Sequence, residues 1–334
     1  MRPVRRSGGG VLVVLLAACV AQPELRGPLP VRNQHPAQLT VLHLPPAPAA
    51  VLPRGAVSTR LDAAYTSLWL VGSDTAGRRY EMDGEYLRTA LSLRAGLGRG
   101  FEFGVEVPVG HTSGGFLDSF VIDYHDALGL PDQNRDSEPR DEFAIEARRG
   151  GTVLWRVERD GFELLDVPLS LTWQVADPAA GPGLALRAGI ELPTGDADRG
   201  YGSGELDASL GALLEHRALG CGFFGHVQHT FAGTPSRSRD LGLRFADVTS
   251  AGGGVELPLG NGLAGLLQVE WETSTLRSLG LAAAARDQLL LWAGFRLDAG
   301  AGWDVELGFG EDLQGLVSPD FTAWLAVVWR PDRG

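Results

Sequence analysis

From about residue 55 onward, apolar and polar residues alternate in segments of roughly ten to fourteen residues, and turn residues separate these segments. One segment carries apolar side chains at every second position: Leu165, Val167, Leu169, Leu171, Trp173 and Val175. Polar and small residues stand between them: Asp166, Pro168, Ser170, Thr172 and Gln174. Period two places the two sets on opposite faces of a sheet. Because the pattern recurs with alternately short and long connections, it predicts a closed antiparallel β-barrel in a membrane.

Composition narrows the alternatives. The chain has 334 residues, and no apolar run approaches the length of about 18 residues that a spanning helix needs. All 29 basic residues are arginine, and the net charge of −12 argues against nucleic acid as a partner. A single all-β barrel fits the uniform rhythm better than two soluble domains, although a secreted β-sandwich is the alternative.

The N-terminus has the features of an export signal. Arg2, Arg5 and Arg6 precede a short apolar stretch, residues 11–18. Leu16-Ala17-Ala18-Cys19 resembles a bacterial lipobox, so residues 1–21 are predicted to be a signal peptide, and Cys19 is a candidate for lipidation. Ordinary cleavage nearby, for example after Ala21, is the alternative. If Cys19 is lipidated, Cys221 alone remains, and an intrachain disulfide is excluded.

Residues 22–54 are rich in proline and are expected to form a periplasmic leader, with a short strand at residues 38–44. The barrel is expected to occupy residues 55–330. Its twelve predicted strands are residues 56–70, 80–97, 101–110, 162–175, 183–193, 204–216, 220–232, 245–258, 262–274, 285–298, 301–312 and 319–330.

The connections support this count. Short and long connections alternate strictly, and in bacterial barrels short turns are periplasmic and long loops extracellular. Counting residues 142–158 as barrel strands would break the alternation. They are therefore expected to form a hairpin within a long extracellular loop, residues 111–161, that also carries a short helix.

Along each strand, the charged side chains fall at alternate positions and so lie on one face. On the lipid face, an Arg or Lys at the midplane would cost about 2–4 kcal/mol. The charged side chains are therefore expected to face a wet lumen. The mostly acidic set favours cations or neutral solutes, and arginines pairing with it across the lumen would leave a filled interior instead of an open pore. The lumen candidates are Arg88, Arg94, Glu102, Glu106, Arg187, Glu205, Asp207, His226, Glu270, Glu272, Arg296, Asp304 and Glu306.

Residues 116–132 depart most clearly from the strand pattern. The apolar residues of this stretch fall at helical spacing, and Gly129 and Pro131 end the helix. The helix is expected either to fold across the barrel mouth and gate or bind, or to cap the rim with solvated charges. A metal site using the histidine is the less favoured alternative. Its polar candidates are Asp118, Asp123, His125 and Asp126.

Two further stretches argue against a metal. Residues 191–207 are rich in Asp and Gly but lack the alternating ligands of a calcium loop, so a glycine-rich crossing at the barrel rim is expected. Among three neighbouring histidines, parity places only His226 in the lumen, with His216 and His229 outside. No Gly-x-Ser-x-Gly elbow occurs either. The sequence therefore predicts no metal, cofactor or catalytic residue.

The stretch PVRNQHP at residues 30–36 resembles the opening of a bacterial family catalogued as domain of unknown function three-one-eight-seven. Residues 116–132 and 140–161 are similar to its central block, and the resemblance extends over most of the chain after residue 28. The turn LPTGD at residues 192–196 is similar to transporter-like outer-membrane barrels, including the phenol-degradation type. The resemblance implies an outer-membrane barrel, with no assigned chemistry. The lipobox-like Cys19 departs from the family.

Together these observations predict a channel or transporter for small molecules in the bacterial outer membrane. The expected partners are outer-membrane lipid, the barrel-insertion machinery and a small-molecule solute. A structural or surface-interaction barrel is the alternative, and a barrel enzyme is a third, since a triad assembled from strand positions would leave no linear motif. Residues 319–330 resemble the C-terminal strand that insertion machinery reads, although residues 330–334 follow its last aromatic residue.

Overall fold

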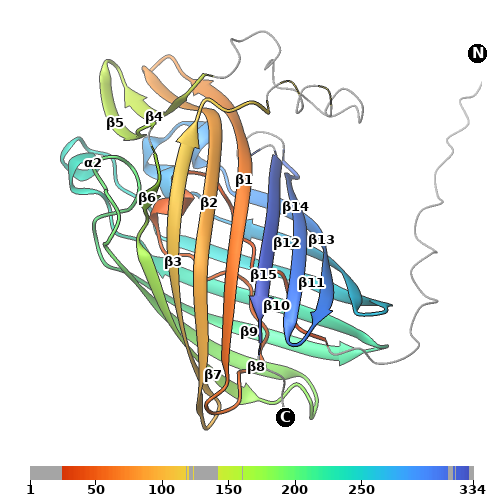
Figure 1. The fold of residues 1–334 in the computed structure, drawn as a ribbon. Coiled ribbons are helices and arrows are strands. Elements are labelled where there is room, and N and C mark those ends of the chain that lie inside the picture. The colour runs from red at the N-terminus through yellow and green to blue at the C-terminus, as the bar shows by residue number, and fades with distance from the viewer. Residues whose placement is uncertain are drawn as a thin grey trace, which may run out of the picture.

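The computed structural model describes residues 25–117, 119, 123, 142–159, 161–314, 319 and 321–330. Within these residues, twelve antiparallel strands close into a barrel, as predicted (Figure 1). The strands are β1 (Val57–Ser73), β2 (Arg78–Gly98), β3 (Phe101–Ser113), β7 (Val167–Ala176), β8 (Gly183–Leu192), β9 (Asp207–Ala218), β10 (Cys221–Phe231), β11 (Val248–Gly260), β12 (Leu263–Glu272), β13 (Gln288–Gly300), β14 (Trp303–Asp312) and β15 (Phe321–Trp329).

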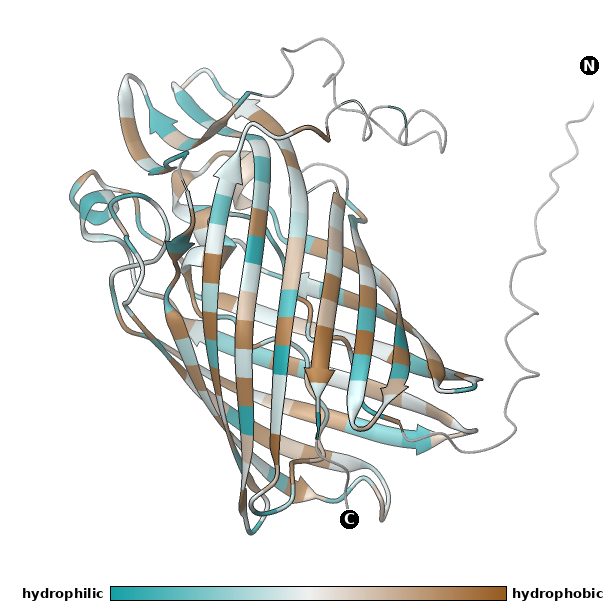
Figure 2. Ribbon diagram, in the orientation of Figure 1, coloured by the Kyte–Doolittle hydropathy of each residue, from teal (hydrophilic) through white to brown (hydrophobic). Residues whose placement is uncertain are grey.

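Each barrel strand pairs with its neighbours in the chain, and β1 closes the ring by pairing with β15 from Thr59↔Trp329 to Ser67↔Phe321. Closure leaves no free edge along this seam, which is what a strand in hydrocarbon requires. The alternation of the sequence explains the two faces. Leu61 is 60% exposed on the outside, whereas Glu306 is fully buried inside. Bands of opposite hydropathy therefore alternate along the strands (Figure 2).

Four connections at one end of the barrel are two-residue turns, and this end is called the turn end below. In each, a non-glycine residue with positive φ precedes a glycine with positive φ: Arg99–Gly100, Leu219–Gly220, Asn261–Gly262 and Ala301–Gly302. Positive φ at both positions characterises type I′ turns, whose twist matches that of antiparallel strands. These turns lie where the sequence predicts short connections.

The opposite end, called the loop end, carries the remaining elements. A hairpin of β4 (Ala144–Arg149) and β5 (Thr152–Val157) forms within the predicted span 142–158. Its β4 strand pairs with residues 78–83 of β2. Short elements complete this end: β6 (Glu163–Leu164), α2 (Ser236–Asp240), the 3₁₀ turn η4 (Thr275–Leu279) and α3 (Ala282–Ala285). No helix in the described part of the chain is long and apolar enough to cross a membrane.

Some strand boundaries differ from those predicted. The strand predicted at 162–175 begins at Val167, because Glu163 and Leu164 leave the apolar–polar alternation and pair separately with β3 as β6. The strand predicted at 204–216 begins at Asp207, and residues 200–206 instead form part of the rim. Residues 1–21 and Cys19 lie outside the described residues.

The largest departure concerns residues 25–54, here named the lumen segment. The sequence predicts a periplasmic leader there, but the structure places the segment against the inward face of the strands, and most of residues 27–44 are buried. A 3₁₀ turn, η2 (Gln38–Thr40), takes the place of the short strand expected at residues 38–44. The chain passes from the turn end to η2 and then returns to enter β1.

Candidate functional site: the filled lumen

Most lumen candidates lie on the inward face, as their parity requires. Eight are buried: Arg88, Glu102, Asp207, Glu270, Glu272, Arg296, Asp304 and Glu306. Four on the same face are half-buried: Arg94, Glu106, Arg187 and His226. Glu205 is the exception. It precedes β9 and pairs at 2.9 Å with Arg239 of α2, so it belongs to the loop end.

The loop-helix candidates fall largely beyond the described residues. Asp118, His125 and Asp126 lie outside them. Asp123 is described as a helical, exposed residue. Within the described residues, no group of three or more His, Cys, Asp or Glu side chains is placed to hold a metal ion.

Inward carboxylates and amides bind the ascending arm of the lumen segment, residues 25–34, through its backbone. Glu256 accepts hydrogen bonds from the backbone N–H groups of Arg26 and Gly27, both at 2.9 Å. Gln268 accepts from the N–H of Leu29 at 2.6 Å and donates to its carbonyl at 3.1 Å. These side chains therefore do what a neighbouring strand would do for an extended chain.

The descending arm, residues 42–54, is held in the same way by strands on the other side of the barrel. Asp207 accepts from the N–H of Leu42 at 2.9 Å, and Arg187 donates to the carbonyl of Pro45 at 2.6 Å. Further backbone N–H groups donate to side chains at 2.9–3.3 Å: Ala50 to Glu215, Val51 to Gln174 and Leu52 to Glu102. The prolines of the segment carry no N–H, so fewer donors need partners in the buried lumen.

The tip of the lumen segment is covered at the loop end. His35 lies 3.0 Å from the Tyr80 hydroxyl, and the two rings stack. Apolar residues of η2 and its flanks join one buried cluster with residues from β2, the β4–β5 hairpin and the η4–α3 loop. Its members include Ala37, Leu39, Val41, Tyr80, Met82, Ile145, Leu154, Trp155, Leu276, Leu279 and Leu281.

Ion pairs line the inward face of the wall, between adjacent or next-nearest strands, and join the wall to the lumen segment. Arg296 contacts Glu306 at 2.6 Å and Glu256 at 2.7 Å, both deeply buried. Arg26 of the lumen segment contacts Asp298 at 2.8 Å and also Asp304. Other inward pairs are Arg60–Glu306, Arg88–Glu106, Arg94–Glu102, His43–Glu272 and His226–Glu270. The arginines thus neutralise most of the acidic residues, and the interior is filled.

Several functional residues are absent from the predicted set. Arg60, Asp62 and Glu256 have the inward parity of their strands, so parity alone was sufficient to find them. Arg26 had no such signal, because nothing in the local pattern of residues 22–54 distinguishes a lumen segment from a leader.

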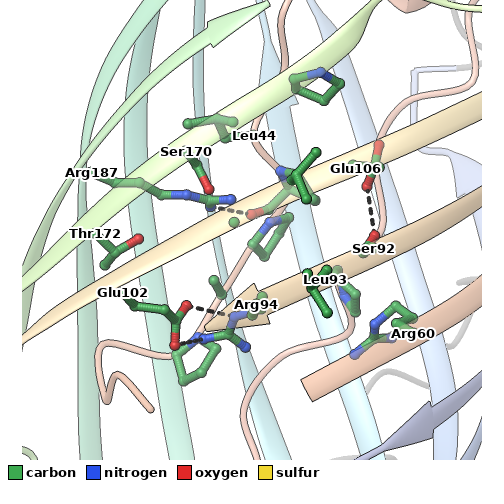
Figure 3. A pocket seen from close by; sticks show the side chains of 18 of the residues that line it. Leu44, Arg60, Ser92, Leu93, Arg94, Glu102, Glu106, Ser170, Thr172 and Arg187 are labelled. Carbon is green, nitrogen blue, oxygen red and sulfur yellow. Dashed lines mark hydrogen bonds and ion pairs between the residues drawn. The ribbon is translucent and has the colours of Figure 1, made fainter. Parts of the chain in front are cut away.

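Space remains around the lumen segment. A cavity of about 100 Å³ lies beneath its prolines, against β2, β3, β7 and β8 (Figure 3). At the turn end, a cavity of about 380 Å³ is lined by Arg94, Glu215, Arg217 and Arg330 beside the descending arm. A third, of about 200 Å³, lies beside Arg26, Arg296 and Asp298. These spaces lie between the lumen segment and the wall of the barrel.

The glycine-rich rim is organised by Asp166. This carboxylate accepts from the backbone N–H groups of Gly195 at 2.8 Å and Ser203 at 2.7 Å. Burial raises the pKa of Asp166 above its usual range, although the two N–H groups act in the opposite direction. A Cβ on Gly202 would lie 2.6 Å from an Asp166 oxygen, so glycine is needed for this close approach.

The closed ring of twelve strands, apolar outside and charged inside, defines a bacterial outer-membrane β-barrel with an occupied lumen. The chain belongs to the family described as Protein of unknown function (DUF3187), which matches residues 10–330. The family resemblance noted in the sequence is therefore confirmed. No curated protein matches the chain.

Solved structures of similar fold are outer-membrane barrels. The COG4313 outer membrane channel from Pseudomonas putida F1 is 12% identical, with a TM-score of 0.56, covering 86% of this chain and 100% of that chain. The NanC porin is 8% identical, with a TM-score of 0.45, covering 82% of this chain and 99% of that chain. The translocator domain of the autotransporter NalP from Neisseria meningitidis is 11% identical, with a TM-score of 0.44, covering 84% and 89%. The fold agrees with the predicted outer-membrane location.

Proposed function

We propose that the protein is an outer-membrane channel for small molecules whose lumen is closed by residues 25–54. The observation that carries this proposal is the way the segment is held. No residue from 25 to 54 belongs to a strand. The hydrogen bonds of this segment with the wall, within the described residues, join side chains to backbone or to other side chains. The twelve strands complete their ladder among themselves. Withdrawing the segment would therefore expose a polar lumen without breaking the barrel.

The size of the barrel limits the solute. Wide aqueous channels belong to barrels of about 16–18 strands, so twelve strands enclose a narrower passage. The inward ion pairs would give this passage donors and acceptors of both signs, which select among small solutes by charge and hydrogen bonding. The outer membrane channel of similar fold from Pseudomonas putida F1 supports transport rather than catalysis as the role of this chain.

The orientation follows from the connections. We assign the turn end to the periplasm and the loop end to the outside, because bacterial barrels have short periplasmic turns. The lumen segment then enters from the periplasm, where residues 1–21 would direct export and a lipidated Cys19 would anchor the chain beside the barrel. Strand β15 would be read by the insertion machinery.

Planar-bilayer recording of the full chain and of a variant lacking residues 25–52 tests the proposal. We expect low conductance from the full chain and a large increase from the deletion variant, since the strand pairing does not depend on the segment. The variant must still run as a compact, heat-modifiable band on gels. If the correctly folded variant neither conducts nor admits solute into liposomes, the protein is not a channel, and a structural or surface-interaction role takes precedence.

A further inference from the structure

The cavity of about 100 Å³ beneath the prolines of the lumen segment has an uneven set of charges. Five arginines line it, Arg26, Arg60, Arg94, Arg187 and Arg330, against three carboxylates, Asp62, Glu102 and Glu106. The carboxylates already have partners. Glu102 accepts from Arg94 at 2.6 and 2.9 Å and from the N–H of Leu52 at 2.9 Å. Glu106 accepts from Arg88 and from Ser92. Asp62 lies 3.7 Å from Arg88, so each carboxylate at this cavity has an arginine beside it.

Arg187 differs from the other arginines here. Its hydrogen bond to a protein acceptor is the one to the carbonyl of Pro45, and no carboxylate of the described residues lies within 4 Å of its guanidinium. Burial of this cation is costly and the neighbouring Arg94 adds repulsion. Glu102 and Glu106 attract the guanidinium from beyond contact distance and offset these costs only in part. An anion in the cavity would offset both costs.

Hydroxyl groups stand beside this guanidinium. Thr172 on β7 is the cross-strand neighbour of both Arg187 and Glu102, and Ser170 is the neighbour of Gly104. Figure 3 shows Ser170, Thr172 and Arg187 around the same space, with Arg94 held by Glu102. A Cβ on Gly104 would lie 2.6 Å from the Ser170 hydroxyl, so glycine there keeps the space between β2 and β7 open. Donors from the neighbouring strands β7 and β8 thus line one cavity.

We propose that this cavity, here named the Arg187 site, binds the carboxylate group of a small organic acid. The planar guanidinium of Arg187 matches the two oxygens of a carboxylate, and the hydroxyls of Ser170 and Thr172 supply further donors. The volume admits several water molecules, which is enough for a carboxylate but not for a large solute. The inference rests on the proposed channel function, since it names the class of solute that the lumen holds. The proposed site prefers an anion, whereas the acidic residues of the sequence predicted a preference for cations or neutral solutes.

The test uses the full chain folded in detergent, with sodium acetate as the probe and sodium chloride at equal ionic strength as the reference. The measured quantity is the temperature at which the heat-modifiable band is lost. We expect acetate to raise this temperature above its value in chloride. The difference should vanish in Arg187→Gln and persist in Arg286→Gln, which removes an exposed arginine in the loop before β13.

A second variant separates ligand binding from the stability of the lumen segment. Ser170→Ala combined with Thr172→Val removes the hydroxyls and leaves the bond from Arg187 to Pro45 in place, so the acetate effect should shrink while stability in chloride is kept. An equal acetate effect in the wild type and in Arg187→Gln would overturn the site. So would an effect of inorganic phosphate without one of acetate, or no acetate effect in the wild type.

These outcomes are independent of the channel test, because binding is measured without a membrane. A barrel that conducts after removal of residues 25–52, and whose full chain shows no acetate effect, is a channel without this site. A barrel that responds to acetate through Arg187 but never conducts retains the site and contradicts the channel.

Discussion

At the residue scale, the inward acidic and amide side chains act mainly on backbone. Glu102, Asp207, Glu256 and Gln268 each accept from an N–H group of the lumen segment. An extended chain crossing a lumen has no neighbouring strand, and buried N–H groups without acceptors are costly. Parity in the sequence places Glu102, Asp207 and Gln268 on lumen-facing strand faces that carry charges. It predicted that these charges select a solute or pair with arginines across the lumen. Their partner turned out to be the chain itself.

Gly96 offers a residue-scale test of how the lumen segment docks. A Cβ there would lie 2.0 Å from the carbonyl oxygen of Pro53 and 2.4 Å from that of Leu52, both backbone atoms. We therefore expect Gly96→Ala to displace the descending arm and raise conductance in planar bilayers. Each ~1.4 kcal/mol lost from docking shifts the docked-to-released ratio about tenfold. Gly265→Ala, whose nearest contact would be 3.5 Å, is the control and should conduct like the wild type.

Asp166 offers a second test, at the rim. Asp166→Ala leaves the N–H groups of Gly195 and Ser203 without their acceptor, at a cost of about 1–3 kcal/mol for each buried group left unpaired. Asp166→Asn keeps one carbonyl acceptor and should cost less than Asp166→Ala. Thermal unfolding followed by gel shift measures both, and equal stability of all three proteins would show that the rim does not depend on this carboxylate.

At the element scale, the twelve strands follow the alternation of apolar and polar residues, whereas the segments that close the lumen show no such periodic pattern. Alternation predicted the twelve strands, and the turn residues predicted where most of them end. The positions of the lumen segment and of the β4–β5 hairpin depend on the contacts between them, which no local pattern predicts. Apolar residues of the hairpin, including Ile145 and Trp155, cover the tip that carries Leu39. Short elements at the loop end thus cover a lumen that the strands leave open.

Shortening this hairpin tests that role. Replacing residues 144–157 with a short glycine–serine linker removes Ile145, Ala147, Leu154, Trp155 and Val157 from the apolar cluster. A cysteine placed at Leu39 in a Cys221→Ser background should then react with a membrane-impermeant maleimide severalfold faster than in the intact barrel. A cysteine at the exposed Leu219, in a turn at the opposite end, provides the control whose labelling should not change. Unchanged labelling at position 39 would show that the hairpin does not shield the tip.

At the scale of the whole molecule, closure is the property on which all others depend. The pairing of β1 with β15 brings residues about 260 positions apart into register, for example Asp62 with Ala326. Closure satisfies the backbone within the barrel wall and sets the width of the lumen. The lumen segment then fills that width, since it lies between walls contributed by β7–β10 on one side and β11–β14 on the other.

Removing the last strand tests closure directly. A chain that ends at residue 312 leaves β1 and β14 with free edges, so we expect it to lose the heat-modifiable gel shift and to be absent from the outer-membrane fraction. A chain that ends after Arg330 keeps the seam and should behave like the full protein. A heat-modifiable band from the chain lacking β15 would mean that closure does not require this strand.

The sequence by itself determined the strand number, the inward and outward parity and the family. These follow from period two and from local turn chemistry, which need only neighbouring residues. It could not determine that residues 25–54 lie inside the barrel, because proline-rich extended chain has the same local pattern in a leader and in a lumen. That choice is made by Glu256, Gln268 and Asp207, which are more than 160 positions away from the groups they bind. Only the closed barrel brings them to one place, and so only the tertiary structure decided that the lumen is filled.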